Sequence, residues 1–197
     1  MTLSPVERIG AARVLPVLRT RDADEAVDVV AGLAAAGVDV IEITTTIAGW
    51  DTALERVQSD HPQTCVGVGT VLTADSAHAA LARGAKFLVS PRLVPAVRAV
   101  AREAGTLFIE GGLTPTELMT ALDAGGIAKL FPAHTVGPDY LRSLLSVVPH
   151  ARIVPTGGIP LSEVGTWLDA GAFAVGVGRD LTAAGDIAAR LRDLGLA

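Results

Sequence analysis

Lys129 is the residue whose type and surroundings most favour chemistry. The chain has only two lysines, Lys86 and Lys129, and its other basic residues are all arginine. Lys129 lies in the apolar run Ile127–Phe131. In a strand, alternation puts Lys129 on the same face as Ile127 and Phe131. Burial lowers a lysine pKa, and a neutral amine can form a Schiff base with a carbonyl. Two interpretations remain: a nucleophile, or a lysine paired with an interior carboxylate for packing.

Glu42 is the acidic candidate that matches this lysine. It lies between two isoleucines in Val40–Thr44, where a buried carboxylate is costly without a partner. Alternation places Glu42 on the same face as Val40 and Thr44, so its side chain can point into the same interior as Lys129. Schiff-base chemistry needs a group that moves protons, and a carboxylate beside a lysine suits this. The alternative is an ion pair with Lys129 or Arg19 that does no catalytic work.

Other polar residues carry weaker signals. Glu110 ends the run Leu107–Glu110 and is a second candidate acid for the interior. Lys86 directly precedes the run Phe87–Ser90, at the end of that strand away from the expected site, and is expected to be structural. His134, close to Lys129, is expected at the rim of the site or in a loop. The remaining histidines have no metal-ligand spacing and are expected at the surface, so no metal site is predicted: His61, His78 and His150.

Eight short β-branched runs must position these residues. They alternate with Ala/Leu-rich stretches at intervals of about 20–26 residues, the length of one βα unit. The runs are Val14–Leu18, Val38–Thr44, Cys65–Thr70, Phe87–Ser90, Leu107–Glu110, Ile127–Phe131, Arg152–Pro155 and Ala174–Gly178. Five glycines just before such runs are expected to close helices in the left-handed conformation: Gly37, Gly84, Gly105, Gly125 and Gly171.

The pattern predicts a (βα)₈ barrel with an extra N-terminal helix, and a single domain over residues 1–197. Three residues predict the start of the N-terminal helix: Ser4 as the N-cap, Pro5 in the first turn and Glu7 as the acid of a capping box. The competing fold is an open doubly wound sheet. It would usually show a glycine-rich turn after the first strand, but no glycine follows Val14–Leu18 directly.

In such a barrel the active site lies at the carboxyl ends of the strands. Polar residues at those ends are Arg19, Glu42 to Thr46, Thr70, Ser90, Glu110, Lys129, Thr156 and Arg179. Two loops could bind an anion there through backbone amides, namely Thr156-Gly157-Gly158 and Gly176-Val177-Gly178-Arg179. They end the seventh and eighth strands, and the loops after these two strands form the usual phosphate site of such barrels. The alternative is that both are ordinary turns.

Composition excludes several classes of protein. The 197 residues are 50% hydrophobic and 4% aromatic, with a formal net charge of -5. We find no run of Lys or Arg for a general nucleic-acid surface, and no apolar stretch long enough to span a bilayer. The one cysteine, Cys65, is expected to be a small buried hydrophobe in a reducing compartment. With no signal peptide in Met1 to Arg13, a cytoplasmic protein is expected.

Five segments, in order along the chain, carry a family resemblance between Val14 and Leu181. They are Ile41-Glu42-Ile43-Thr44, Gly67-Val68-Gly69-Thr70-Val71-Leu72, Ser90-Pro91, Lys129-Leu130-Phe131-Pro132-Ala133 and Pro155-Thr156-Gly157-Gly158-Ile159. This set resembles the family of 2-keto-3-deoxy-6-phosphogluconate (KDPG) and 4-hydroxy-2-oxoglutarate (KHG) aldolases. The K-x-F-P element is its most specific member.

The resemblance implies a class I aldolase on a (βα)₈ barrel, usually a homotrimer, that needs neither metal nor cofactor. It implies Lys129 as the Schiff-base lysine and Glu42 as the general acid/base. Thr70 and Pro91 would line the pyruvate pocket, and Phe131 would pack beside the lysine. The distal phosphate of the substrate would bind at the two glycine loops, through Gly157, Gly158, Gly176 and Gly178.

One departure from the family concerns the pyruvate carboxylate. Many members bind it with an arginine four residues after the catalytic glutamate, where this chain has Thr46. The branch of 2-dehydro-3-deoxy-6-phosphogalactonate aldolases also lacks that arginine and has Ile-Leu-Arg-Gly at the end of strand one. Val17-Leu18-Arg19-Thr20 resembles that element. We therefore expect Arg19 to bind the carboxylate; the alternative is that it caps a loop or pairs with a surface acid such as Asp22.

Two further departures affect the rest of the pocket. Glu110 stands where the family usually has a proline before Gly111. A second carboxylate in a small pocket would raise the pKa of one acid and disfavour an anionic substrate. Arg179 replaces the serine usual at the phosphate site, and its guanidinium can bind a phosphate or a carboxylate.

The favoured function is reversible cleavage of a 2-keto-4-hydroxy acid, such as KDPG or KHG, to pyruvate and an aldehyde. The distal end of the substrate is a phosphate or a carboxylate. One alternative is a phosphate-binding barrel isomerase or synthase without a covalent intermediate, which has no need of an inward lysine. Another is a non-catalytic barrel that binds a metabolite, an interpretation that Thr46 and Glu110 keep open.

Overall fold

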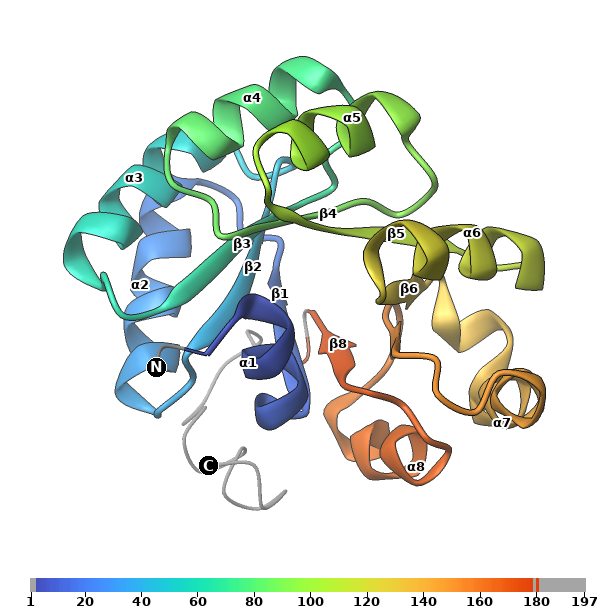
Figure 1. Cartoon of the computed structure of the whole chain (residues 1–197). Coiled ribbons are helices and arrows are strands. Elements are labelled where there is room, and N and C mark those ends of the chain that lie inside the picture. The colour runs from blue at the N-terminus through green and yellow to red at the C-terminus, as the bar shows by residue number, and fades with distance from the viewer. Residues whose placement is uncertain (1–2, 179, 181–197) are drawn as a thin grey trace.

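The computed structural model describes residues 3–178 and 180. Parallel strands form the centre, and the helices α2 to α8 surround them (Figure 1). The strands are β1 (Val14–Leu18), β2 (Val40–Thr44), β3 (Cys65–Gly69), β4 (Phe87–Val89), β5 (Leu107–Gly112), β6 (Ala128–Leu130), β7 (Ile153–Pro155) and β8 (Val175–Val177). Each agrees within a few residues with a run expected from the sequence.

A helix precedes the first strand, and a further one follows each of β1 to β7. The α-helices are α1 (Pro5–Ala12), α2 (Ala23–Ala35), α3 (Trp50–Asp60), α4 (Ala74–Ala82), α5 (Pro95–Glu103), α6 (Pro115–Gly125), α7 (Gly137–Val147) and α8 (Val164–Asp169). Two short 3₁₀ turns, η1 (Ala133–Thr135) and η2 (Leu161–Glu163), precede α7 and α8. None of the helices in the described part of the chain combines the length and apolar character of a membrane span.

The strands close into a nearly complete barrel. The sheet order is β7-β6-β5-β4-β3-β2-β1-β8, with every neighbouring pair parallel. At the open seam, Thr156 and Gly176 form an isolated parallel bridge. The amide of Phe173 also donates to the carbonyl of Ile153 at 2.9 Å. The predicted (βα)₈ barrel with an extra N-terminal helix is therefore confirmed.

Alternation along the strands separates two apolar cores. The inner core fills the barrel, where the Phe87 ring occupies the space that a side chain at Gly67 would need. Ile9 of α1, 0% exposed, belongs to this inner core, so α1 covers the amino-terminal end of the barrel. The outer core packs the other face of the strands against the helices. The polar residues after the strands are thereby directed to the opposite, carboxyl-terminal end.

Local signals act mostly as the sequence predicts. The Ser4–Glu7 capping box begins α1. Four of the five expected helix-closing glycines have positive φ angles: Gly37, Gly84, Gly105 and Gly171. The fifth prediction is wrong, because α6 includes Gly125 and the left-handed residue is Gly126, with φ 70°. Gly125 packs so closely on the Phe108 carbonyl that a Cβ would lie 2.7 Å from the oxygen.

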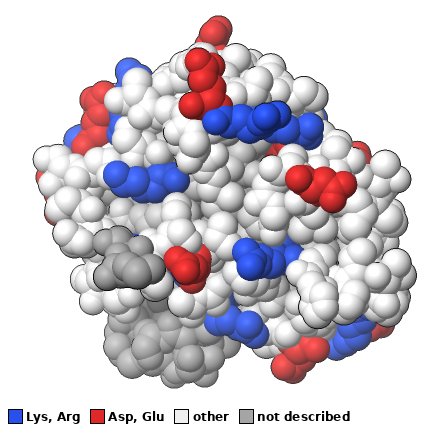
Figure 2. All heavy atoms as spheres, viewed as in Figure 1, with Lys and Arg blue, Asp and Glu red and all other residues white. Residues whose placement is uncertain are grey.

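The predicted burial of Cys65 is confirmed. Its side chain lies in the inner core, and the residue is 6% exposed. Burial raises the pKa of this thiol to about 11, so it is a poor nucleophile at neutral pH. On the face of the molecule shown in Figure 2, basic side chains form separate groups with acidic side chains beside them.

Candidate active site

Lys129 lies in β6 with its side chain inside the barrel. Its neighbours Ala128 and Leu130 belong to the outer core, so alternation directs Lys129 inward. The residue is 3% exposed. Burial lowers the pKa of Lys129 below its ordinary value; the Glu42 carboxylate opposes this effect, and the charge of Arg19 adds to it. A larger share of this lysine is therefore the neutral, nucleophilic amine than for a lysine in water.

Glu42 brings a carboxylate to Lys129 from β2. It is 1% exposed, and its Oε1 lies 3.5 Å from Lys129 Nζ. Gly69 in β3 makes this position possible, because a Cβ there would overlap the Glu42 carboxylate. Apart from Lys129, no group among the described residues lies in hydrogen-bond contact with either carboxylate oxygen. The pair therefore offers a buried amine beside a carboxylate that retains its capacity to accept protons.

A cavity of about 420 Å³ opens at the carboxyl ends of β1, β6, β7 and β8. Residues predicted to bind substrate contribute to its lining, namely Arg19, Phe131, Thr156, Gly157, Gly158 and Gly178. The cavity lies close to the buried lysine, because Lys129 Nζ is 5.6 Å from the centre of the Phe131 ring. Four further residues line the cavity that the sequence did not predict to bind substrate: Val17, Ile159, Pro160 and Asp180.

Arg19 follows β1 directly and is exposed at this cavity. Within the described residues it forms no ion pair. Asp22, its expected alternative partner, instead accepts a hydrogen bond of 3.0 Å from the Glu25 amide and caps α2. Glu25 in turn pairs with Arg21 at 3.1 Å. The surface pair of Arg19 with Asp22 therefore does not form, and the guanidinium is available to an anion in the cavity.

The glycines of the loop after β7 lie against the loop after β6. Gly157 has φ 96° and Gly158 has φ 70°, and a Cβ on either would crowd the ring of Phe131 or His134. His134 is exposed in η1 and contacts the Gly157 carbonyl through Nδ1 at 3.1 Å, in agreement with the expected rim or loop position. Within the described chain, the amides of both glycines have no acceptor, so they can bind an anion.

Gly176, predicted in the second anion loop, lies within β8, and its bridge to Thr156 brings β8 beside the loop after β7. A Cβ at Gly176 would overlap the Thr156 side chain, so glycine permits the bridge that closes the barrel. Gly178 lines the cavity. Arg179, the expected phosphate or carboxylate ligand, lies outside the described residues.

Thr70 and Pro91 lie at the ends of β3 and β4 and do not line the 420 Å³ cavity. Thr70 has φ 60°, a left-handed conformation that β-branched residues rarely adopt. Pro91 packs on β5 at Gly111, where a Cβ would overlap the Pro91 backbone. This close contact is a second case, with Gly69, in which a strand glycine makes room for a predicted site residue.

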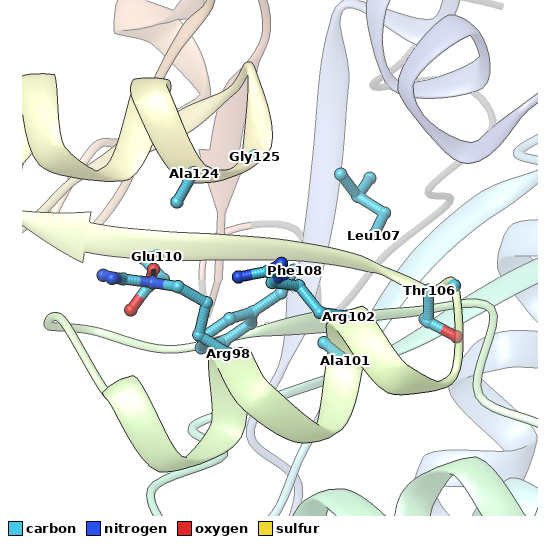
Figure 3. Close-up of a pocket in the computed structure, with 10 residues that line it drawn as sticks. Arg98, Ala101, Arg102, Thr106, Leu107, Phe108, Glu110, Ala124 and Gly125 are labelled. Carbon is cyan, nitrogen blue, oxygen red and sulfur yellow. Dashed lines mark hydrogen bonds and ion pairs between the residues drawn. The ribbon is translucent and has the colours of Figure 1, made fainter.

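The expectation that Glu110 shares the pocket is wrong. Phe108 and Glu110 lie on the outer face of β5, whereas Ile109 belongs to the inner core. Glu110 is 1% exposed and forms an ion pair of 2.5 Å with Arg98 of α5 (Figure 3). Its other oxygen accepts a hydrogen bond of 2.7 Å from the Val94 amide, just before α5.

The cavity beside this pair is separate from the barrel mouth. It measures about 230 Å³ and lies over β5 between α5 and α6, with Ala124 and Gly125 on its far side (Figure 3). Helix α5 covers Glu110, so its carboxylate does not enter the pocket. The pattern Leu107–Glu110 alone left this open, because Phe108 and Ile109 are both apolar and do not mark the inner face.

A family model described as KDPG and KHG aldolase matches residues 6–192. The chain belongs to this family. The match covers nearly the whole sequence and includes Lys129 and Glu42, whose side chains meet inside the barrel. The resemblance seen in the short motifs is thus confirmed at the level of the family.

Curated relatives agree with the family match. A 2-dehydro-3-deoxy-6-phosphogalactonate aldolase from Escherichia coli K12 is 31% identical over 87% of this chain and 85% of its own length. A 2-dehydro-3-deoxy-phosphogluconate aldolase from Zymomonas mobilis is 35% identical over 80% of this chain and 76% of its own length. The two names represent both branches to which the sequence shows similarity.

A solved structure resembles the whole chain. KDPG aldolase from Legionella pneumophila, with pyruvate captured as a covalent carbinolamine, aligns with a TM-score of 0.85 at 27% identity. The alignment covers 100% of this chain and 94% of that one. The family member described here therefore shares its fold with an enzyme in which a covalent pyruvate adduct has been observed.

Proposed function

We propose that this protein reversibly cleaves a 2-keto-4-hydroxy acid to pyruvate and an aldehyde through a Schiff base on Lys129. The family establishes the enzyme class, because its members are aldolases and therefore lyases. The observation that carries the proposal is the buried lysine with its pKa lowered and the Glu42 carboxylate 3.5 Å away. A buried amine of this kind suits a class I mechanism.

The first half of the reaction forms the electron sink. The neutral Lys129 amine attacks the C2 carbonyl of the substrate and gives a carbinolamine. Loss of water leaves a protonated imine. Because the positive imine accepts electrons, this mechanism uses no metal and no cofactor.

The second half breaks the carbon–carbon bond. Glu42, directly or through a water, takes the proton of the C4 hydroxyl, and the electrons of the C3–C4 bond move into the imine. The aldehyde leaves, and an enamine of pyruvate remains on Lys129. Protonation of its C3 carbon, followed by hydrolysis of the imine, releases pyruvate and restores the amine. The carboxylate returns the proton in the reverse direction.

The binding roles come from the resemblance to the family, and the cavity at the barrel mouth supports part of them. We assign the pyruvate carboxylate to Arg19, the pyruvate pocket to Thr70 and Pro91, and the wall beside the lysine to Phe131. The distal phosphate or carboxylate is assigned to the anion loops, Thr156, Gly157, Gly158, Gly176, Gly178 and Arg179. What supports this assignment is the cavity at the ends of β1, β6, β7 and β8, where the amides of Gly157 and Gly158 have no acceptor among the described residues.

The family also suggests how the protein exists in the cell. We propose a homotrimer, as is usual in this family. We also propose a single domain over residues 1–197, which the described strands support because they all belong to one sheet. We also propose a cytoplasmic location, because the single thiol, Cys65, is buried and unpaired.

Reductive trapping tests the proposed function. The protein is incubated with pyruvate, reduced with borohydride, weighed by mass spectrometry and digested to locate the adduct. We expect one pyruvyl group on Lys129 and none in Lys129→Arg, since arginine has no nucleophilic amine. Lys86→Arg is the matched control and should be trapped like the wild type. An unmodified wild-type protein would overturn the proposal in favour of a barrel enzyme without a covalent intermediate. An adduct at Lys86 alone would overturn the assignment of the imine to Lys129.

A further inference from the structure

Of three consecutive threonines at the end of β2, the first two connect this strand to the ends of both neighbouring strands. Thr44 Oγ1 donates a hydrogen bond of 2.7 Å to the Leu18 carbonyl, the last residue of β1. Thr45 Oγ1 donates a hydrogen bond of 2.8 Å to the Thr70 carbonyl, directly after β3. The Leu18 carbonyl directly precedes Arg19, and the other carbonyl belongs to Thr70 itself. Both Arg19 and Thr70 are proposed above to bind pyruvate.

The third threonine is already occupied. The hydroxyl oxygens of Thr44 and Thr46 lie 2.8 Å apart. A threonine hydroxyl has one proton, and Thr44 gives its proton to Leu18, so Thr46 must be the donor between the two. Thr46 therefore has no proton left for a carboxylate at the position where many relatives have arginine. Binding of the pyruvate carboxylate then depends more strongly on Arg19 and Thr70.

Thr70 is held in an unfavourable backbone conformation. Its φ of 60° is rare for a β-branched residue, and such strain persists only where surrounding contacts impose it. The contacts on either side are identifiable. The Thr45 amide donates to the Gly69 carbonyl at 2.9 Å, and the Val71 amide donates to the Val89 carbonyl at 3.0 Å. The Thr45 hydroxyl is the side-chain donor that holds the Thr70 carbonyl itself.

We propose that Thr45 is a positioning residue, which holds Thr70 in the left-handed conformation that presents it to the carboxylate end of pyruvate. The inference rests on the proposed function, because that function assigns Thr70 to the pyruvate pocket. Thr45 itself touches no reacting atom. Its loss should weaken pyruvate binding while the chemistry between Lys129 and Glu42 continues.

Steady-state kinetics in the condensation direction test this role. Thr45→Val keeps the shape of the side chain but removes the donor, and should raise KM for pyruvate about fivefold, the worth of one neutral hydrogen bond. The change in kcat should stay within about twofold, and Thr45→Ser should restore KM. Thr120→Val, which removes a surface hydroxyl bonded only to its own helix α6, is the matched control. An unchanged KM in Thr45→Val would overturn the inference.

A double-mutant cycle separates positioning from a general structural effect. Glycine adopts positive φ freely, so Thr70→Gly removes both the strain and the threonine that Thr45 holds. In that background Thr45→Val should change KM for pyruvate by less than about twofold, since coupled residues are not additive. Fully multiplicative effects would contradict the inference. Failure of the wild type to trap pyruvate would instead refute the proposed function, so the two failures are distinguishable.

Discussion

The Nζ atom of Lys129 lies 3.5 Å from Oε1 of Glu42, and the two side chains are 3% and 1% exposed. The contact joins β6 to β2, which are not neighbours in the sheet. Burial favours the neutral amine, whereas the carboxylate favours the ammonium ion. The protonation state of the lysine is therefore set by two opposing effects, and each can be changed by mutation.

Removal of the carboxylate should slow turnover without preventing imine formation. Glu42→Gln keeps the shape of the side chain but cannot take a proton, so kcat should fall by roughly 10²- to 10⁴-fold. Borohydride should still trap pyruvate on Lys129. Glu103→Gln, at the exposed end of α5, is the control and should have wild-type kcat. A fall in kcat of less than about threefold would assign the proton transfer to a water molecule, because Glu110 lies outside the barrel.

The pH dependence of trapping should reveal the lowered pKa of Lys129. With cyanoborohydride and saturating pyruvate, the trapping rate should rise with pH as the amine loses its proton. The midpoint should lie below about 10.4, the value of an exposed lysine. Glu42→Gln removes the charge that raises the pKa, so its midpoint should move to lower pH. Arg19→Met removes a charge that lowers the pKa, so its midpoint should move to higher pH. Shifts in the opposite directions would contradict this account of the pair.

Arg19 should determine the affinity for pyruvate. A charge-assisted bond to a carboxylate is worth about 1.5–3 kcal/mol, so Arg19→Met should raise KM for pyruvate roughly tenfold or more. The measurement is a titration of pyruvate at fixed aldehyde. Arg21→Met is the matched control, since Arg21 pairs with Glu25 on the surface. Thr46→Arg in the Arg19→Met background should recover affinity, and a KM within about twofold of wild type in Arg19→Met alone would refute the role.

Glu110 should contribute to stability and not to pyruvate trapping. Glu110→Ala leaves the Arg98 guanidinium and the Val94 amide without their acceptor, which should cost about 3 kcal/mol of unfolding free energy. This is the low end for a buried pair, because Arg98 is 26% exposed. Urea unfolding measures the loss, and Glu110→Leu with Arg98→Met should recover much of it. If Glu110→Gln shifted the pH midpoint for trapping, the Glu110 carboxylate would have to act on Lys129 in the pocket, and this prediction would be wrong.

Local sequence patterns determined the elements and the identity of the chemical groups. The period of the runs, the cap at Ser4 and the glycines before the strands are properties of short segments, which fold in nearly the same way wherever they occur. Alternation around Lys129 was decisive because both of its neighbours are apolar residues that pack on helices. Because Ala128 and Leu130 occupy the outer face of the strand, Lys129, the only interior lysine of the described chain, must point into the barrel.

Only the tertiary structure decided which groups meet. The approach of Lys129 to Glu42 requires closure of the barrel and the absence of a side chain at Gly69, and neither follows from a local pattern. The outward direction of Glu110 depends on Arg98, which α5 brings over β5. Gly125 is inside α6 and packs against the Phe108 carbonyl, and the left-handed residue that ends the helix is Gly126. In each case the deciding contact joins residues far apart in the chain, whose distance is set by packing and not by sequence spacing.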